Sequence, residues 1–130
     1  MGIVKDAVAE IERKAKILGK INTLQSKIND ARKAMNDLGN DKTKLDGYIT
    51  TFEGHQKTLS GKYLEIKQND VFEGNMATIL KNKIDPVEKA ISDGIKYSND
   101  LSQQLDTQIK NLNNKITSWE TEKNSLKRSL

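Results

Sequence analysis

The feature that most constrains this chain is a row of apolar residues separated alternately by four and three positions. The row keeps one register over roughly seven heptads. This spacing places the side chains along one narrow side of an α-helix, where a second helix can cover them. We call this row the first seam; its members are Ile17, Ile21, Leu24, Ile28, Ala31, Met35, Leu38, Leu45, Ile49, Phe52, Leu59, Tyr63 and Ile66.

The first seam predicts one long helix over about residues 3–67. A short series, Val4, Val8, Ile11, Ala15 and Leu18, reaches the same side with a small offset and extends the helix toward the N-terminus. Gly39-Asn40 favours a break, but we expect continuity because a break would have no reason to preserve the heptad phase. Lys42 and Gln56 occupy seam positions, where polar groups weaken packing but fix the register or contact an acidic group of a partner.

The second half of the chain predicts a turn and two further helices. Residues 68–75 are polar and lose the heptad phase, which indicates a reversal, and residues 76–83 predict a short helix. Asp85, Pro86 and Glu88 are typical of a helix start, so we expect a kink or break at Ile84-Asp85 and a helix over about 86–130. The second seam is Val87, Ile91, Ile95, Leu101, Leu105, Ile109, Leu112, Ile116, Trp119, Leu126 and Leu130, with Lys123 as a polar exception.

Folding at the reversal lays one seam against the other. The halves are nearly equal in length, so we expect an elongated, antiparallel, all-α helical hairpin without an overhang, forming a single domain over residues 1–130. Only 35% of residues are hydrophobic and 5% are aromatic, while 31% are charged, which is enough for a narrow seam but not for a rounded core. Trp119 and Tyr63 fall on seam positions and are expected to be core residues.

Several classes of protein do not fit the sequence. The net charge of +4 comes from 22 basic and 18 acidic residues scattered along the chain, so nucleic-acid binding is not indicated. We also expect neither membrane insertion nor a signal peptide, because long apolar runs are missing. The single histidine, His55, has no second histidine or cysteine to share a metal. We therefore expect no catalytic residue, metal or cofactor, and no enzyme activity.

Three glycines recur every seven residues on the side of the first helix that faces away from its seam. Each glycine costs about 1 kcal/mol of helix stability relative to alanine. Threonines beside them complete a row of small side chains along which another helix could approach closely; bending or fraying of the helix is an equally weighted explanation. We call this candidate partner interface the glycine stripe: Gly47, Thr50, Thr51, Gly54, Thr58 and Gly61.

The reversal carries a family pattern. Val71-Phe72-Glu73-Gly74-Asn75 resembles the Trp-x-Gly turn of the ESAT-like WXG proteins, with Phe72 in place of tryptophan. Together with the long first helix and the run from Leu105 to Ile116, it makes the chain similar to the YwqH-like family. These are small helical proteins associated with LXG toxins of Gram-positive type VII secretion. The resemblance implies that Phe72 and Gly74 are turn residues.

The resemblance also implies a function. The chain would be a chaperone or targeting factor that binds the helical N-terminal domain of an LXG-type toxin in the cytoplasm, before or during its delivery to the secretion apparatus. The family's export motif is missing, since Leu101 follows Tyr97 and Met76 follows Phe72 where an acidic residue is required. A second small helical protein would then supply the export signal, and secretion with the toxin stays open. The alternative is a self-associating structural coiled coil, such as a scaffold or phage component.

Overall fold

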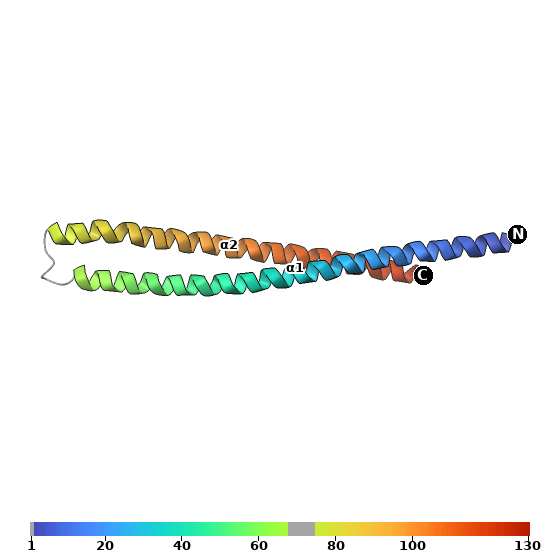
Figure 1. The fold of residues 1–130 in the computed structure, drawn as a ribbon, viewed down its shortest axis with the longest axis horizontal. Helices are drawn as coiled ribbons and strands as arrows, with labels where there is room; N and C mark the ends of the chain where they lie inside the picture. Colours follow the sequence, from blue (N-terminus) through green and yellow to red (C-terminus); the bar gives the residue numbers. More distant parts are fainter. Residues whose placement is uncertain (1, 68–74) are drawn as a thin grey trace. The chain divides into compact units, whose positions relative to one another are not determined.

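The computed structural model describes residues 2–67 and 75–130. They form two helices, α1 (Gly2–Lys67) and α2 (Asn75–Arg128), which pack against each other (Figure 1). The predicted all-α helical hairpin is therefore confirmed. The predicted turn residues Phe72 and Gly74 lie outside the described residues, whereas Asn75, predicted as the end of the turn, begins α2.

The chain divides into two compact units, and each pairs a segment of α1 with a segment of α2. Unit 1 comprises Met1–Gly39 and Thr107–Leu130, and unit 2 comprises Asn40–Asp106. The helix α1 continues through Gly39 and Asn40 without interruption. The first seam keeps its phase across these residues, so packing against α2 offsets the weak helix preference of glycine and asparagine.

Unit 1 contains the better packed core. Ile28, Ala31 and Ile116 form a buried cluster, and Met35, Leu112 and Trp119 pack against it. Ile28 is fully buried, and burial of a side chain of this size contributes about 1.5–3 kcal/mol. The contact of Trp119 with the cluster agrees with its predicted place in the core.

Unit 2 has a thinner core. Among the described side chains of this unit, Ile49 is the buried hydrophobic one and Ser102 the buried polar one, while Leu45, Leu59 and Tyr63 from α1 are half-buried. The heptad positions of α1 therefore face α2 in this unit as well. Phe52 is the departure, because the first seam predicted it to be covered and its side chain is instead 52% exposed.

A kink or a break was predicted at Ile84-Asp85, and the break was wrong. The short helix and the C-terminal helix are one element, α2, with Pro86 inside it. Pro86 is exposed, whereas Ile84 and Ile91 are half-buried. Because these two isoleucines stay in heptad phase on either side of Pro86, seam packing offsets the lost backbone hydrogen bond.

The course of the second seam also differs from the prediction. Val87, Leu101 and Leu130 are exposed, and the covered positions are instead taken by Glu88, Ser98 and Ser102. The observed seam is the strict continuation of the heptad from Leu105 toward the N-terminus, through small or polar residues that a search for apolar residues passes over. The Glu88 carboxylate accepts a hydrogen bond from the Ser60 hydroxyl at 3.3 Å.

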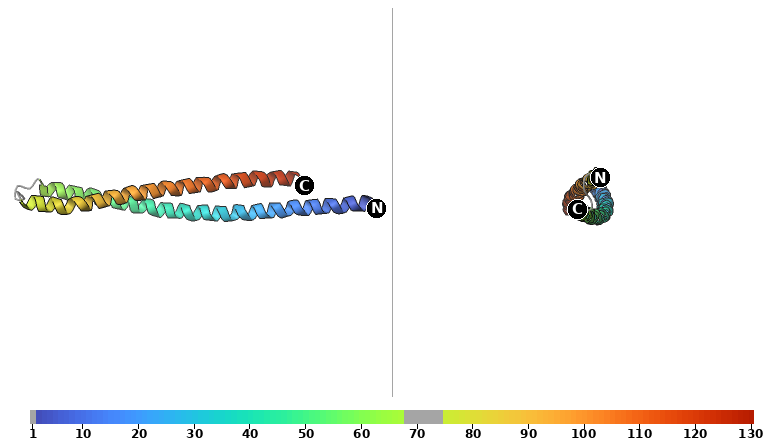
Figure 2. Two further views of the ribbon diagram at one scale, coloured as in Figure 1. Left: turned by 90° about the horizontal axis from the view of Figure 1, so that it is seen from above. Right: turned by 90° about the vertical axis from the view of Figure 1, so that its left-hand side faces the viewer.

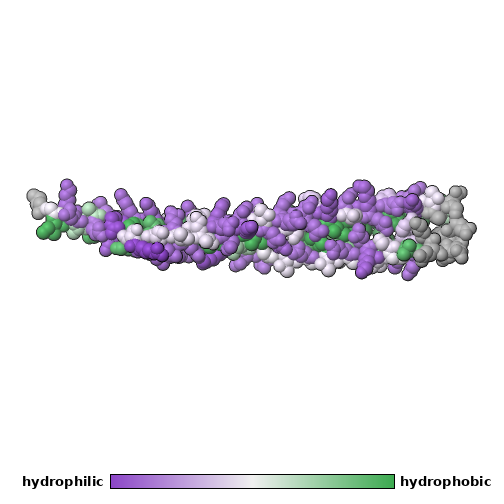
Figure 3. All heavy atoms as spheres, turned by 180° about the vertical axis from the view of Figure 1, so that it is seen from behind, coloured by the Kyte–Doolittle hydropathy of each residue, from purple (hydrophilic) through white to green (hydrophobic). Residues whose placement is uncertain are grey.

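The expectation of no overhang was wrong as well. The helix α1 has 66 residues and α2 has 54. Residues 2–16 of α1 are all exposed, and within unit 1 they extend beyond the end of α2 (Figures 1 and 2). Hydrophobic side chains are accordingly visible at the N-terminal end of α1 in Figure 3.

Candidate functional site: an apolar groove in unit 2

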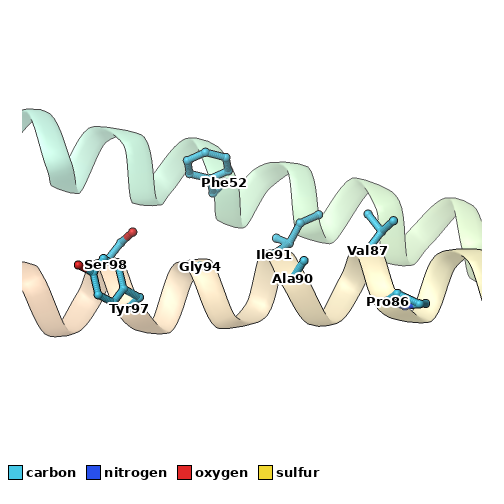
Figure 4. Close-up of a pocket in the computed structure, with 8 residues that line it drawn as sticks. All are labelled: Phe52, Pro86, Val87, Ala90, Ile91, Gly94, Tyr97 and Ser98. Atoms are coloured by element: carbon cyan, nitrogen blue, oxygen red, sulfur yellow. The ribbon is translucent and has the colours of Figure 1, made fainter.

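An open groove of about 600 Å³ lies beside the seam of unit 2. Its lining comes from both helices, with Phe52 from α1 and the other residues from α2 (Figure 4). Tyr97 is 71% exposed and Val87 is 49% exposed, so large apolar groups face solvent here. The lining is Phe52, Pro86, Val87, Ala90, Ile91, Gly94, Tyr97 and Ser98.

The groove exists because α2 offers small residues opposite the Phe52 ring. Gly94 has no side chain, and an added Cβ there would meet nothing within 4 Å. Ser98 takes a seam position that a larger residue would normally fill. Phe52 therefore keeps half of its surface uncovered although it lies on the heptad pattern of α1.

The apolar face continues beyond the groove. Val87, Gly94 and Leu101 each precede a seam position of α2, and Tyr48 precedes the buried Ile49 of α1. In an antiparallel pair such flanking positions lie on the same side of the seam. Tyr48 and Leu101 are both exposed, so unit 2 carries more apolar surface on this side than two helices cover.

A polar layer interrupts the seam of unit 2. The Lys42 ammonium donates to Asp46 Oδ2 at 2.7 Å and lies 3.7 Å from Asp106 Oδ2. The hydroxyl of Ser102, from α2, donates to Asp46 Oδ1 at 2.7 Å. A shift of one helix along the other would leave the buried Ser102 without this acceptor, so the layer fixes the register.

The same layer shifts two pKa values. The hydrogen bonds from Lys42 and then from Ser102 lower the pKa of the Asp46 carboxyl, because they favour its charged form. The hydrogen bond to Asp46 raises the pKa of the Lys42 ammonium. Lys42 is thus paired within its own chain, as an alignment residue would be.

Unit 1 has polar contacts of its own across the two helices. Lys123, the polar exception of the second seam, donates to Gln25 Oε1 at 2.7 Å. Arg32 forms an ion pair with Glu120. These contacts join α1 to α2, which supports the interpretation of Lys123 as an alignment residue.

The residues of the glycine stripe lie exposed on α1 of unit 2. An added Cβ at Gly47, Gly54 or Gly61 would meet nothing within 4 Å, so no contact within the chain requires glycine there. The threonine hydroxyls donate to carbonyl oxygens one turn earlier; Thr51, for example, bonds Gly47 at 3.1 Å. The glycine stripe therefore presents methyl groups and backbone atoms to solvent, because the hydroxyl donors of its threonines are already bonded.

The groove offers apolar contact surface rather than carboxylate, amine or imidazole groups. The hydroxyls of Tyr97 and Ser98 are the only side-chain polar groups among its lining residues, and His55 is exposed. Within the described ranges, no three histidine, cysteine, aspartate or glutamate side chains are grouped as metal ligands would be. The surface is suited to accept apolar side chains from another polypeptide.

Sequence reasoning did not identify the groove. Val87 was assigned to the seam, and Gly94 and Tyr97 were given no role in binding. Following the strict heptad from Leu105 toward the N-terminus would have placed Ser102 and Ser98 in the seam. It would thereby have left Val87, Tyr97 and Leu101 outside it as uncovered apolar residues.

The fold and the groove define a helical hairpin with an uncovered apolar face. Comparison of the chain with protein-family models, with curated proteins and with solved structures gives no match. Neither of the two described helices is apolar enough over a sufficient length to cross a membrane.

Proposed function

We propose that this chain is a non-catalytic helical binding partner of the N-terminal domain of an LXG-type toxin in Gram-positive type VII secretion. The observation that carries the proposal is the groove of unit 2, where Phe52 and Tyr97 are exposed beside an incompletely covered seam. The family resemblance of the sequence supports the choice of the toxin.

A third helix fits the groove better than a small ligand does. The groove runs beside two paired helices. Small or apolar residues recur at heptad spacing along this side of α2, at Val87 and Gly94 in the groove and at Leu101 beyond it. An amphipathic helix lying there would place its apolar side chains against Phe52 and above Gly94, as helices do in a three-helix bundle. Aromatic side chains of this kind often dominate the binding energy of an interface.

The glycine stripe is a second surface for the same partner. It faces away from α2, so a helix bound there would not occupy the groove. Small residues permit close approach of another helix backbone, and no described contact within the chain requires glycine at Gly47, Gly54 or Gly61. A toxin domain of several helices could contact both surfaces.

The test is co-purification of the toxin's helical N-terminal domain with variants of this chain. Phe52→Asp places a charge in the groove and is expected to abolish binding, because a carboxylate would be buried without a partner. Leu64→Asp is its matched control: Leu64 is 53% exposed, lies on the same helix and is not part of the groove.

A triple substitution of Gly47, Gly54 and Gly61 tests the glycine stripe in the same binding assay. Leucine at the three positions would obstruct an approaching helix, whereas alanine would keep the surface nearly as small. Loss of binding with leucine but not with alanine identifies the stripe as an interface. Undiminished binding by Phe52→Asp and by the leucine variant, both verified as folded, would refute the proposal.

The complex would assemble in the cytoplasm, and secretion with the toxin requires an export signal from a second small helical protein. The alternative function, a self-associating structural coiled coil, predicts assembly without any toxin. Its support is the exposed apolar series at the N-terminal end of α1.

A further inference from the structure

The N-terminal end of α1 carries a row of apolar side chains that nothing in the described structure covers. The exposed fraction is 68% for Ile11 and for Val4, and 48% for Val8 and for Leu18. We call this row the N-terminal stripe; its members are Val4, Val8, Ile11, Ala15 and Leu18.

The N-terminal stripe is a separate face, so the expectation that it reaches the same side of the helix as the first seam with a small offset was wrong. Continuing the first seam from Ile17 in strict phase leads to Lys14 and Glu10, which are charged, and then to Ala7 and Ile3. The stripe is displaced from this line by one residue, or about 100° around the helix. A chain segment that prolonged the pairing with α2 would therefore cover Lys14 and Glu10 first and leave the stripe free.

The end of α2 is attached on the other side of α1. The Arg13 guanidinium donates to the Ser129 carbonyl oxygen at 2.7 Å and forms an ion pair with Glu10 at 2.6 Å. Arg13 precedes the seam position Lys14, and this flank of the helix is opposite to the flank that carries the stripe. The contact with α2 therefore does not obstruct access to the stripe.

We propose that the N-terminal stripe pairs, in antiparallel orientation, with the same stripe of a second copy of this chain. Its alternating spacing of four and three residues is that of a coiled-coil seam. With the two-fold axis between Ala9 and Glu10, Val8 faces Ile11 of the second copy and Val4 faces Ala15. The overlap covers residues 4–15, which lie within the exposed segment.

The flanking charges favour this arrangement. Lys5 follows Val4 and Glu12 follows Ile11, so both lie on the same edge of the stripe. In the antiparallel pair Lys5 lies near Glu12 of the second copy. The two-fold symmetry forms this pair of opposite charges twice. On the opposite edge Ala7 lies near Lys14, so no like charges meet.

A parallel pair lacks this complementarity. In register, it would bring Ala7 near Glu12 of the second copy and Lys14 near Gly19, with no pair of opposite charges. The antiparallel interface is also self-complementary, so it closes after two copies and does not propagate into a filament. The overlap is shorter than a standard protein interface, and we expect a dissociation constant in the micromolar range or weaker.

The first experiment measures mass by sedimentation equilibrium at loading concentrations from about 1 μM to about 1 mM. The full chain is expected to pass from monomer to dimer over this range. Val8→Asp is expected to weaken dimerisation at least about tenfold, because the carboxylate would face Ile11 in the interface. Circular dichroism confirms that the variant keeps its helix content.

A charge-exchange series tests the antiparallel contacts. Lys5→Glu alone and Glu12→Lys alone each place like charges together twice and are expected to weaken the dimer about fivefold to tenfold. The double variant Lys5→Glu/Glu12→Lys restores the opposite pairs and is expected to recover most of the affinity. If the losses of dimer affinity from the two single substitutions add up in the double variant, Lys5 and Glu12 are not partners.

Spin labels measure the orientation directly, and the chain has no cysteine to interfere. The antiparallel pair places a label at Ala9→Cys close to its counterpart on the second copy. Labels at Lys16→Cys would be separated by roughly 20 Å along the axis. Short distances at both positions would indicate parallel pairing and overturn the proposal.

The groove lies in the other unit, so this proposal and the proposed function can fail separately. A chain that stays monomeric at the highest concentration overturns self-pairing whatever the toxin assay shows. If the chain is monomeric and Val8→Asp no longer binds the toxin, the N-terminal stripe is a toxin-binding surface. A dimer that persists unchanged in Val8→Asp would place the self-association elsewhere.

Discussion

Replacing Gly47, Gly54 and Gly61 together by alanine is expected to stabilise the free protein. All three lie within α1. Glycine gives the unfolded chain more conformational freedom than alanine does, and this freedom is lost when the helix forms. An added Cβ would meet nothing within 4 Å at any of the three positions. The gain in helix preference is therefore not offset by a steric clash.

The magnitude follows from the helix preferences of the two residues. Each exchange contributes about 1 kcal/mol in an exposed helix interior, so the triple variant should gain about 3 kcal/mol. For a chain of this length each kcal/mol corresponds to roughly 3–5 °C in the melting temperature, which gives an increase of about 10 °C. A single variant such as Gly54→Ala should show about one third of this gain.

Thermal unfolding followed by circular dichroism measures the effect, and amide hydrogen exchange locates it. Slower exchange is expected in α1 of unit 2 and not in residues 17–35 of unit 1. An unchanged or lower melting temperature would show that these glycines serve a backbone conformation other than a regular helix. It would also remove the reason for treating them as a binding surface.

Three further perturbations test the packing. Ile28→Ala removes the fully buried side chain of unit 1 and is expected to lower the free energy of unfolding, measured with urea, by about 2–5 kcal/mol. Pro86→Ala restores a backbone donor within α2 and should raise the melting temperature; a decrease would contradict a continuous α2. The pKa of Asp46 is lowered by Lys42 and Ser102, so its contribution to stability is complete above the ordinary value of 3.8 and is lost as the pH falls through the lowered one. Urea titrations should therefore show a smaller acid-induced loss of stability for Asp46→Asn than for the wild type.

The helical hairpin could be predicted because a heptad pattern is a local property of the sequence. The alternation of apolar residues from Ile17 to Tyr63 specifies a helix and the side on which it is covered, and the structure places most of these residues against α2. Continuity through Gly39 followed from the same phase. Trp119 was predicted in the core for the same reason.

The errors arose where the residue type did not match the burial of the side chain. Phe52, Val87 and Leu101 are apolar and were assigned to the seams, yet they are exposed. Ser102 is polar and was not assigned, yet it is buried and bonded to Asp46. Hydrophobicity alone could not separate them, because a residue's burial depends on what the opposite helix places in front of it.

By itself the sequence determined an all-α hairpin, the long first helix with its seam and the absence of a histidine or cysteine set for a metal, because these depend on spacing and composition. Only the tertiary structure decided the register of α2 against α1. That register places Gly94 and Ser98 where they open a groove beside Phe52, sets Ser102 against Asp46 and leaves residues 2–16 uncovered. The physical reason is that the register depends on contacts between residues far apart in the chain, such as the hydrogen bond of Ser102 with Asp46.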